Sequence, residues 1–390
     1  MKFTEYVEVN PKTNLKKGEY APFVEMANVS ITYREPEKIE NKKYTSGPKF
    51  QNGDSVVARI EPCLQNGKKF FWKSDKIGFG STEYIVFRAK EGKMDSKYLF
   101  YLLKTDYIKK SMVSSMVGAT GRQRVNNDIF GQIEIVVPNI EKQKKIGRTL
   151  FLYDDLIENN QKQIKLLEEA AQRLYKEWFV DLRFPGHENT KIVDGVPEGW
   201  NWCKLEDAIQ LDPKVTLTKE RMKQFIPMSA LSTASMVLDE SQFTETTSNS
   251  GSKFQNGDTL LARITPCLEN GKTAYVSGLK SDEGAVGSTE YIVMRAKTIN
   301  SYMVYLLART DDFRQSAINS MSGSDGRQRV KSDKLKMLDY LHPTSELVEK
   351  FENVEEPIFE KIYRLSEQMQ QAKQARDLLL PKLMRGEVEV

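Results

Sequence analysis

Two short clusters of arginine and glutamine are the side chains in this chain best suited to a chemical task. They are Arg122-Gln123-Arg124 and Arg327-Gln328-Arg329, and each follows a glycine-bounded tetrad, GATG or GSDG. Arginine can donate two hydrogen bonds to guanine O6 and N7, and glutamine can bind adenine in a similar way. Arginine also binds phosphates. The clusters therefore point to DNA, although an ordinary surface loop could hold the same residues paired with nearby acids.

Two further basic pairs recur, one inside strand-like patterns and one after Asn-Gly turns: Arg59 with Arg263, and Lys68 with Lys272. We regard them as weaker candidates for DNA binding, because an arginine such as Arg59 could equally be a structural residue. Two acids, Glu83 and Glu290, recur in the same way. Their position favours a role in stabilising the fold, though a carboxylate can also accept a hydrogen bond from cytosine N4.

Residues that could catalyse a reaction or hold a metal are scarce. The two histidines, His187 and His342, stand alone, and the sequence contains no HExxH or paired CxxC pattern. The segment Asn270-Gly271-Lys272-Thr273 resembles the end of a phosphate-binding loop, but Pro266 stands where that loop needs glycine. We therefore expect neither a metal site nor a catalytic residue.

The methyl-transfer motifs that a DNA-modifying enzyme would need are incomplete. Asn10-Pro11 and Asp212-Pro213 resemble the start of an amino-methyltransferase motif, but the second proline and the base-stacking aromatic do not follow. No glycine-rich loop for S-adenosylmethionine appears. Cys63 and Cys267 have no histidine beside them, which favours structural thiols over nucleophiles. The chain is predicted to bind no cofactor of its own.

Composition places the chain among ordinary globular proteins. It has 390 residues, 39% of them apolar, and a net charge of only +4, so bulk positive charge cannot carry its binding to nucleic acid. Three dispersed cysteines do not suggest a disulfide framework and fit a reducing cytoplasm. The N-terminus lacks the apolar segment of a signal peptide, and no apolar run approaches the roughly 20 residues that cross a bilayer. We expect a cytoplasmic protein.

An internal repeat determines the architecture. FQNGDSVVARIEPCLQNGK at residues 50–68 returns as FQNGDTLLARITPCLENGK at residues 254–272, with fourteen of nineteen positions identical. GSTEYIV and GRQRV also return, and the offset stays near 205 residues. This period is the size of a domain with a connector, far longer than a solenoid repeat. The chain is therefore a tandem duplication.

The first part of each copy has an α/β pattern. In the first copy, residues 56–61 and 83–89 alternate like strands, and Asn-Gly pairs mark the turns between them. Residues 97–116 have a helical pattern. Residues 132–137 resemble a closing strand that Pro138 ends.

The second part of each copy is a long helix with a coiled-coil seam. The seam positions alternate in steps of four and three, and all but one are apolar: Ile146, Leu150, Tyr153, Ile157, Asn160, Ile164, Leu167, Ala171, Leu174 and Trp178. A shift of 205 residues gives a second seam: Phe351, Glu355, Ile358, Ile362, Leu365, Met369, Ala372, Arg376, Leu379 and Leu383. Pro357 and Pro381 could bend or trim the second helix. We expect the two helices to pack as an antiparallel pair.

The resulting fold class is α+β, with two α/β target recognition domains separated by two long antiparallel helices and related by a pseudo-two-fold duplication. The segments are predicted as a first recognition domain at 1–140, a central spacer helix at 141–183 and a linker at 184–199. A second recognition domain follows at 200–344, and a C-terminal spacer helix at 345–390. The Pro, Gly and polar residues between Arg183 and Trp200 are typical of a linker.

Three motifs resemble the specificity (S) subunits of type I restriction-modification enzymes, and the likeness extends over essentially the whole chain. KQKKIGRTLFLYDDLIENNQKQIKLLEEAAQRLYKEWFVDLRFPGHE, residues 142–188, is similar to the family's central helical region. PEGW at 197–200 followed by Lys204-Leu205 resembles the opening of a recognition domain, and QARDLLLPKLMRGEV at 374–388 resembles the family's C-terminal end. The first domain departs from the pattern, since it lacks the PEGW opening.

The resemblance implies a DNA-binding, non-catalytic subunit. Each recognition domain would read one half of a split double-stranded DNA site, and the helices would dock two methyltransferase subunits, which use S-adenosylmethionine. Two endonuclease/translocase subunits would complete the enzyme. We predict that Phe151, Leu152, Trp178 and Phe179 form the docking surface. Two alternatives stay open: a specificity subunit for a fused, type II-like methyltransferase-nuclease, and a coiled-coil adaptor that does not bind DNA.

Overall fold

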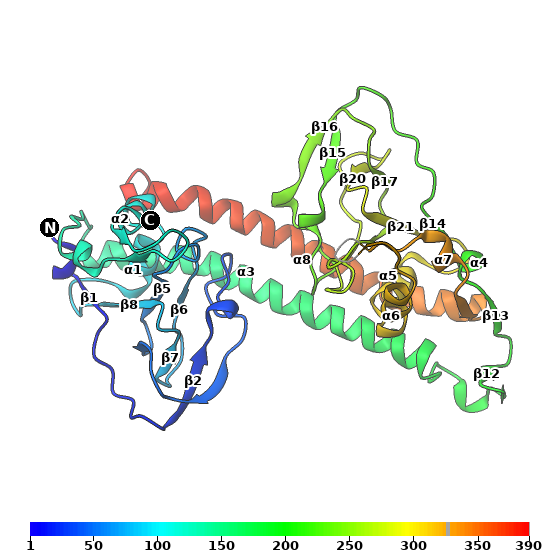
Figure 1. Cartoon of the computed structure of the whole chain (residues 1–390), viewed down its shortest axis with the longest axis horizontal. Helices are drawn as coiled ribbons and strands as arrows, with labels where there is room; N and C mark the ends of the chain where they lie inside the picture. The colour runs from blue at the N-terminus through cyan, green and yellow to red at the C-terminus, as the bar shows by residue number, and fades with distance from the viewer. Residues whose placement is uncertain (325–327, 390) are drawn as a thin grey trace. The chain divides into compact units, whose positions relative to one another are not determined.

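The computed structural model describes residues 1–324 and 328–389 (Figure 1). The chain divides into two compact units. Unit 1 comprises Met1–Asn160 with Gln368–Val390, and unit 2 is the continuous segment Gln161–Glu367. Both chain termini therefore belong to unit 1, and each unit holds one sheet-rich domain together with parts of two long helices.

Unit 1 is built on two four-stranded sheets. The first has the order β1-β8-β5-β6, all antiparallel: β1 (Val7–Val9), β8 (Tyr84–Ala89), β5 (Ser55–Ala58) and β6 (Lys69–Phe71). The second has the order β3-β2-β7-β4, with β2 and β7 parallel: β3 (Glu40–Lys43), β2 (Tyr20–Val24), β7 (Gly78–Gly80) and β4 (Lys49–Phe50). The two strands predicted from alternation are β5 and β8. Strand β5 ends three residues before the predicted limit, where the Arg59 carbonyl accepts a hydrogen bond from the Val125 amide and Ile60 forms an isolated bridge with Arg124.

The helical stretch predicted after β8 is two short helices, α1 (Ser96–Leu102) and α2 (Asp106–Ser114). The Asp95 side chain caps α1 by accepting a hydrogen bond from the Tyr98 amide at 2.9 Å. The closing strand predicted at residues 132–137 is wrong, since only an isolated bridge joins Glu134 to Lys2. Residues 1–3 lie beside this segment, and the Ile135 amide donates to the Met1 carbonyl while the Phe3 amide donates to the Ile133 carbonyl, which is too little pairing for a strand.

Unit 2 repeats these sheets strand for strand. Its orders are β14-β21-β18-β19 and β16-β15-β20-β17, with the same single parallel pair. The strands are β14 (Ile209–Leu211), β21 (Tyr291–Ala296), β18 (Thr259–Ala262), β19 (Thr273–Tyr275), β16 (Thr244–Thr246), β15 (Lys223–Ile226), β20 (Ala285–Gly287) and β17 (Ser252–Phe254). Helices α5 (Ser301–Arg309) and α6 (Asp311–Asn319) follow β21 as α1 and α2 follow β8. The topology confirms the tandem duplication.

Unit 2 also has the closing strand that unit 1 lacks. A short helix, α4 (Leu205–Ala208), separates β13 (Asn201–Lys204) from β14, and α7 (Ser332–Lys336) precedes β22 (Asp339–His342). Strand β13 pairs with β22 over four residues. Because β13 comes directly after the PEGW opening, the extra residues before the second domain supply the partner strand.

The two long helices are α3 (Ile140–Tyr175), which continues into a π-helical turn at Lys176–Val180, and α8 (Ser345–Arg385). Within unit 1, Ile157 packs with Met369 and Ala372, while Ile146 clusters with Leu383. Residue numbers rise along α3 as they fall along α8, so the helices are antiparallel there, as predicted.

The two prolines of α8 neither end nor trim it. Pro357 and Pro381 are both exposed, so water can bind the carbonyl groups that lose their helical partners. The seam is buried over most of its length in both units. Its polar members Asn160, Glu355 and Arg376 are buried as well.

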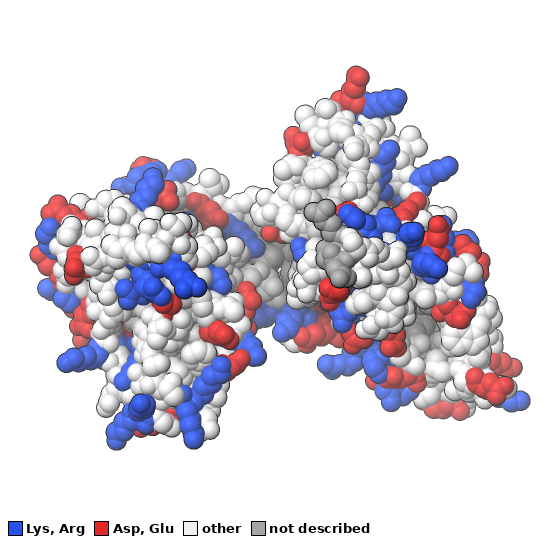
Figure 2. Space-filling view, in the orientation of Figure 1, with Lys and Arg blue, Asp and Glu red and all other residues white. Residues whose placement is uncertain are grey.

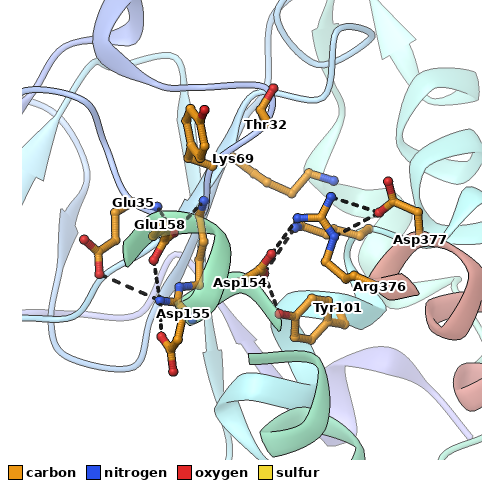
Figure 3. A network of polar contacts seen from close by, with 12 residues as sticks. Thr32, Glu35, Lys69, Tyr101, Asp154, Asp155, Glu158, Arg376 and Asp377 are labelled. Carbon is orange, nitrogen blue, oxygen red and sulfur yellow. Dashed lines mark hydrogen bonds and ion pairs between the residues drawn. The ribbon is translucent and has the colours of Figure 1, made fainter. Parts of the chain in front are cut away.

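Buried charges tie α3 to the rest of unit 1 (Figure 3). Asp154 accepts hydrogen bonds from the Tyr101 hydroxyl and from Arg376 of α8, each at 2.5 Å, and Lys104 lies 3.8 Å away. One turn along α3, Glu158 binds the buried Arg34 guanidinium at 2.6 Å. Burial alone would raise the pKa of the Asp154 carboxyl, but Lys104, Arg376 and Tyr101 together lower it. Asp154 is therefore a carboxylate that joins the recognition domain, α3 and α8 of unit 1.

Candidate DNA interface

The first arginine loop, residues 118–124, begins at a short hairpin. Strands β9 (Met116–Val117) and β10 (Arg124–Val125) pair, and the glycines at both ends of the tetrad have positive φ, 122° at Gly118 and 79° at Gly121. Glycine is the residue that adopts this conformation without steric cost. In the first copy the glycine-bounded tetrad therefore makes a tight turn that presents the residues after it.

The second arginine of each loop is held by the repeated glutamate. The Arg124 guanidinium donates to both carboxylate oxygens of Glu83, with the shortest distance 2.7 Å, and Arg329 binds Glu290 in the same way, also at 2.7 Å. The hydrogen bond to Arg329 lowers the pKa of the Glu290 carboxyl. The Nε and Nη2 edge of the guanidinium is thus already engaged with a carboxylate in both copies.

Arg59 and Arg263 lie behind the loops. The Arg59 guanidinium donates to the Val125 carbonyl at 3.0 Å, and Arg263 donates to the Val330 carbonyl at 2.7 and 3.0 Å. Both arginines are half-buried. These contacts support the structural interpretation that the sequence left open, in which the two residues anchor the loop to the end of a core strand.

Lys68 and Lys272 also bind the protein itself. The Lys68 Nζ donates to the Met26 carbonyl at 2.8 Å, and the Lys272 Nζ donates to the Met228 carbonyl at 2.9 Å. Each lysine therefore holds the short helical turn that follows the strand β2 or β15. Contact of these two lysines with DNA stays a prediction.

The remaining loop residues differ in exposure. Arg122 is exposed, whereas Gln123 and Gln328 are half-buried, and their carbonyls accept hydrogen bonds from the Glu61 and Thr265 amides. Arg327 lies outside the described residues. Among the described members of the two clusters, Arg122 is the one whose side chain is most available to a ligand.

A repeated turn that the sequence analysis associated with methyl transfer has a structural role. Asn10 and Asp212 have φ near 50°, and their side-chain oxygens accept hydrogen bonds from the amides of Val86 and Val293 at 3.1 and 3.0 Å. Asparagine and aspartate tolerate this left-handed conformation better than most residues. The Asn-Pro and Asp-Pro pairs therefore fix a turn against β8 and β21.

The predicted docking residues divide into buried and exposed ones. Phe151 is only 4% exposed, packs 4.9 Å from the Phe71 ring and lies under the Arg34 guanidinium. Trp178 is 8% exposed and contacts Phe351, and Phe179 is half-buried against the same ring. Leu152 is 58% exposed. Phe151 and Trp178 are thus buried rather than exposed: the first recognition domain covers Phe151 on a side of α3 away from the seam, and Trp178 packs on Phe351 at the end of the seam.

The surface charge is mixed in sign, and the described residues contain no cluster of metal ligands. Lysine and arginine side chains are interspersed with acidic ones over the face in Figure 2, in keeping with the small net charge. In residues 1–324 and 328–389, no group of three or more His, Cys, Asp or Glu side chains is arranged to hold a metal ion. The helices in this part of the chain are all too short or too polar to span a membrane.

Comparison with known proteins shows that the sequence is similar to a family of DNA specificity proteins. The type I restriction modification DNA specificity domain matches residues 7–169. The specificity subunit of the type I restriction enzyme MjaIX from Methanocaldococcus jannaschii is 27% identical over 305 residues, which cover 76% of this chain and 69% of that protein. The EcoAI specificity subunit from Escherichia coli is 35% identical over 140 residues, which cover 35% of this chain and 24% of the relative.

A solved structure has the same fold over nearly the whole chain. It is the S subunit of a type I restriction-modification system from M. genitalium, with a TM-score of 0.60 and 15% identity, covering 98% of this chain and 95% of that one. Its likeness agrees with the duplicated sheets and long helices described above. The chain is thus similar to the specificity subunits of type I restriction-modification systems over most of its length, and its residues 7–169 match their DNA specificity domain.

Proposed function

We propose that this chain reads a bipartite double-stranded DNA site, one half with each recognition domain, and that it has no active site of its own. The observation that carries the proposal is the repeated loop. In both units the last arginine of the repeated cluster binds a glutamate, and another arginine donates to the backbone carbonyl of the next residue. Such duplication gives one chain two similar DNA-binding surfaces.

The chemistry would belong to partner subunits. We propose two methyltransferase subunits, which bring S-adenosylmethionine, and two endonuclease/translocase subunits, all assembled on the long helices. The similarity to type I specificity subunits supports this assignment. The exposed, non-seam positions of α3 and α8 are the surfaces that the fold leaves for them, with Leu152 as an example.

Co-expression with a methyltransferase partner tests the proposed function. Long-read sequencing of the host DNA should show two modified adenines in a split motif, one on each strand. The purified chain incubated with S-adenosylmethionine and DNA should transfer no methyl group. Methyl transfer by the chain alone, or a continuous unsplit motif, would show that the proposal is wrong.

Arg122 tests the arginine loop without disturbing its anchor. We expect Arg122→Ala to weaken binding of one half-site by about 1–3 kcal/mol if the side chain contacts a base, with relaxed selectivity at one position. If it contacts a phosphate, all sequences should weaken alike and the salt slope should fall by about one. Fluorescence anisotropy across a salt series distinguishes the two.

Arg148→Ala is the matched control for that experiment, since Arg148 is exposed on α3 of the same unit. If the two substitutions change the DNA affinity equally, the loop is an ordinary surface segment and does not bind DNA specifically. Arg124→Ala is unsuitable as the first variant because it also leaves Glu83 without its arginine.

Leu152 tests the docking surface. Leu152→Glu should reduce co-purification of the methyltransferase subunits at least tenfold, because a charged group would be placed in an apolar contact, while the chain stays folded. Val136→Glu is the control: Val136 is 90% exposed in the same unit but lies outside the long helices. A complex that survives Leu152→Glu would place docking elsewhere. Phe151 cannot serve this purpose because it is buried.

A further inference from the structure

Two lysines recur in the duplicated domains without any part in the contacts described so far. KFQNGD at residues 49–54 returns at 253–258, and an Asn-Pro-Lys turn at 10–12 returns as Asp-Pro-Lys at 212–214. Lys49 lies opposite Phe79 in the register of β4 and β7, and Lys253 lies opposite Val286 at the same place in β17 and β20. The lysines therefore occupy equivalent positions in the two copies.

Other residues of the two motifs, not the lysines, make the contacts that hold the motifs in the fold. Asp54 forms a bidentate ion pair with Arg88, and Asp258 does the same with Arg295, all at 2.7–2.8 Å. In the turn, the side chains of Asn10 and Asp212 hold the adjacent strand. Retention of the lysines thus needs a reason other than the fold.

The lysine side chains themselves are available. Lys12 and Lys214 are exposed, and Lys253 is half-buried. Within residues 1–324 and 328–389, the Nζ atoms of these three lysines make no hydrogen bond or ion pair with the protein. The Lys49 Nζ lies over the Tyr44 ring, 4.7 Å from its centroid, which leaves its other hydrogen-bond donors for a ligand.

In unit 2 the two lysines line one surface groove. The groove has a volume of about 460 Å³, and its lining includes Lys214, Lys253, Asp212 and Thr289. Thr289 directly precedes Glu290, which holds Arg329, so the groove borders the anchor of the arginine loop. Asp212 is the acid in this lining, and it is engaged by the Val293 amide and the Ser332 hydroxyl. The groove therefore offers two ammonium groups to an anion.

We propose that Lys214 and Lys253, and their repeats Lys12 and Lys49, bind DNA phosphates and seat the backbone of the duplex beside each arginine loop. This inference rests on the proposed function. Phosphates fit better than bases because the same lysines serve both domains, and the backbone is the part of DNA that does not change with sequence. Lysine also binds as a point charge, which suits a phosphate without requiring a fixed base edge.

Salt-dependent binding of the full chain to a fluorescein-labelled 40-base-pair duplex of mixed sequence tests the proposal. The slope of log affinity against log salt changes by about 0.9 for each phosphate contact. We therefore expect Lys214→Gln/Lys253→Gln to lower the slope by close to two, and Lys12→Gln/Lys49→Gln to do the same. Lys214→Arg/Lys253→Arg, which keeps both charges, should restore the slope.

The matched controls are Lys361→Gln and Lys144→Gln, exposed lysines on α8 of unit 2 and α3 of unit 1. They should leave the slope within measurement error. A random 45-base-pair pool selected with wild-type and Lys→Gln chains should return the same motif from both. An unchanged slope in the Lys→Gln variants overturns the phosphate proposal alone, as does a changed motif, which would indicate base contact. Failure of the wild-type chain to bind any duplex would overturn the proposed function with it.

Discussion

Asp154→Ala should destabilise unit 1 by about 3–5 kcal/mol, because it removes the carboxylate beside the Lys104 ammonium and leaves the buried Arg376 guanidinium with the exposed Asp377 as its acidic partner. Hydrogen exchange measured by mass spectrometry should show the loss in peptides of α1, the centre of α3 and the end of α8. Peptides from unit 2 should keep wild-type exchange rates. Glu141→Ala, at an exposed position at the start of α3, should change stability by less than about 0.5 kcal/mol.

The equivalent positions in the second copy indicate which residues could replace Asp154 and Arg376 together. The residues 205 positions away from Asp154 and Arg376 are Phe359 and Ala171, both buried and apolar. Asp154→Leu/Arg376→Ala should therefore recover the part of the loss that comes from Arg376, since replacing a buried pair by apolar residues is often neutral, while Lys104 still lacks its carboxylate. If the double variant is as unstable as Asp154→Ala, the apolar packing of unit 2 does not transfer to unit 1.

Glu355→Leu should raise the unfolding free energy of unit 2 by about 3 kcal/mol at pH 8. Glu355 is fully buried on the α8 seam, and neither carboxylate oxygen has a hydrogen-bond partner among the described residues. Burial raises the pKa of this carboxyl from 4.5 to about 7. A shift of about 2.5 pKa units corresponds to about 3 kcal/mol of lost stability once the group must ionise.

The pH dependence gives the sign of this effect. Between about pH 4.5 and 7 the folded chain keeps the Glu355 proton that the unfolded chain has released, so the stability of unit 2 should fall as pH rises through this window. Urea unfolding of wild type and Glu355→Leu at pH 5 and pH 8 measures it: the two curves should diverge with rising pH. Glu352→Gln, at an exposed position one turn away, should follow wild type. Parallel curves for wild type and Glu355→Leu would refute the prediction.

The sequence could predict those features that depend on repetition and periodicity. The seam from Ile146 to Trp178 follows from the apolar spacing alone, and its antiparallel pairing follows from the order of the two copies. The repeat of the sheets was foreseeable because the strand patterns around Val56 and Tyr84 return almost unchanged. The arginine loops were also marked by repetition, and their contact with DNA stays a prediction.

Other features depend on contacts between residues that are far apart in the sequence, and the sequence alone could not predict them. Periodicity on α3 separates Phe151 from the seam, but it cannot show that the recognition domain covers that side of the helix. The pairing of Arg124 with Glu83 joins residues 41 positions apart, and the only signal in the sequence was that both return in the second copy. The strand expected at residues 132–137 failed for a simple physical reason: its pattern was suitable, but it lacked a neighbour long enough to pair with it.

The discontinuity of unit 1 has a consequence for the order in which the chain folds during synthesis. Domains of most multidomain proteins complete themselves from the N-terminus onward. Here residues Gln368–Val390, which are made after unit 2, belong to unit 1, whereas unit 2 is complete at Glu367. The first recognition domain to be translated is thus the last to gain its full core, since Asp154 and Ile146 wait for Arg376 and Leu383. A nascent chain arrested after Glu367 would hold a finished second domain and an unfinished first one, exposed to proteases and chaperones until translation ends.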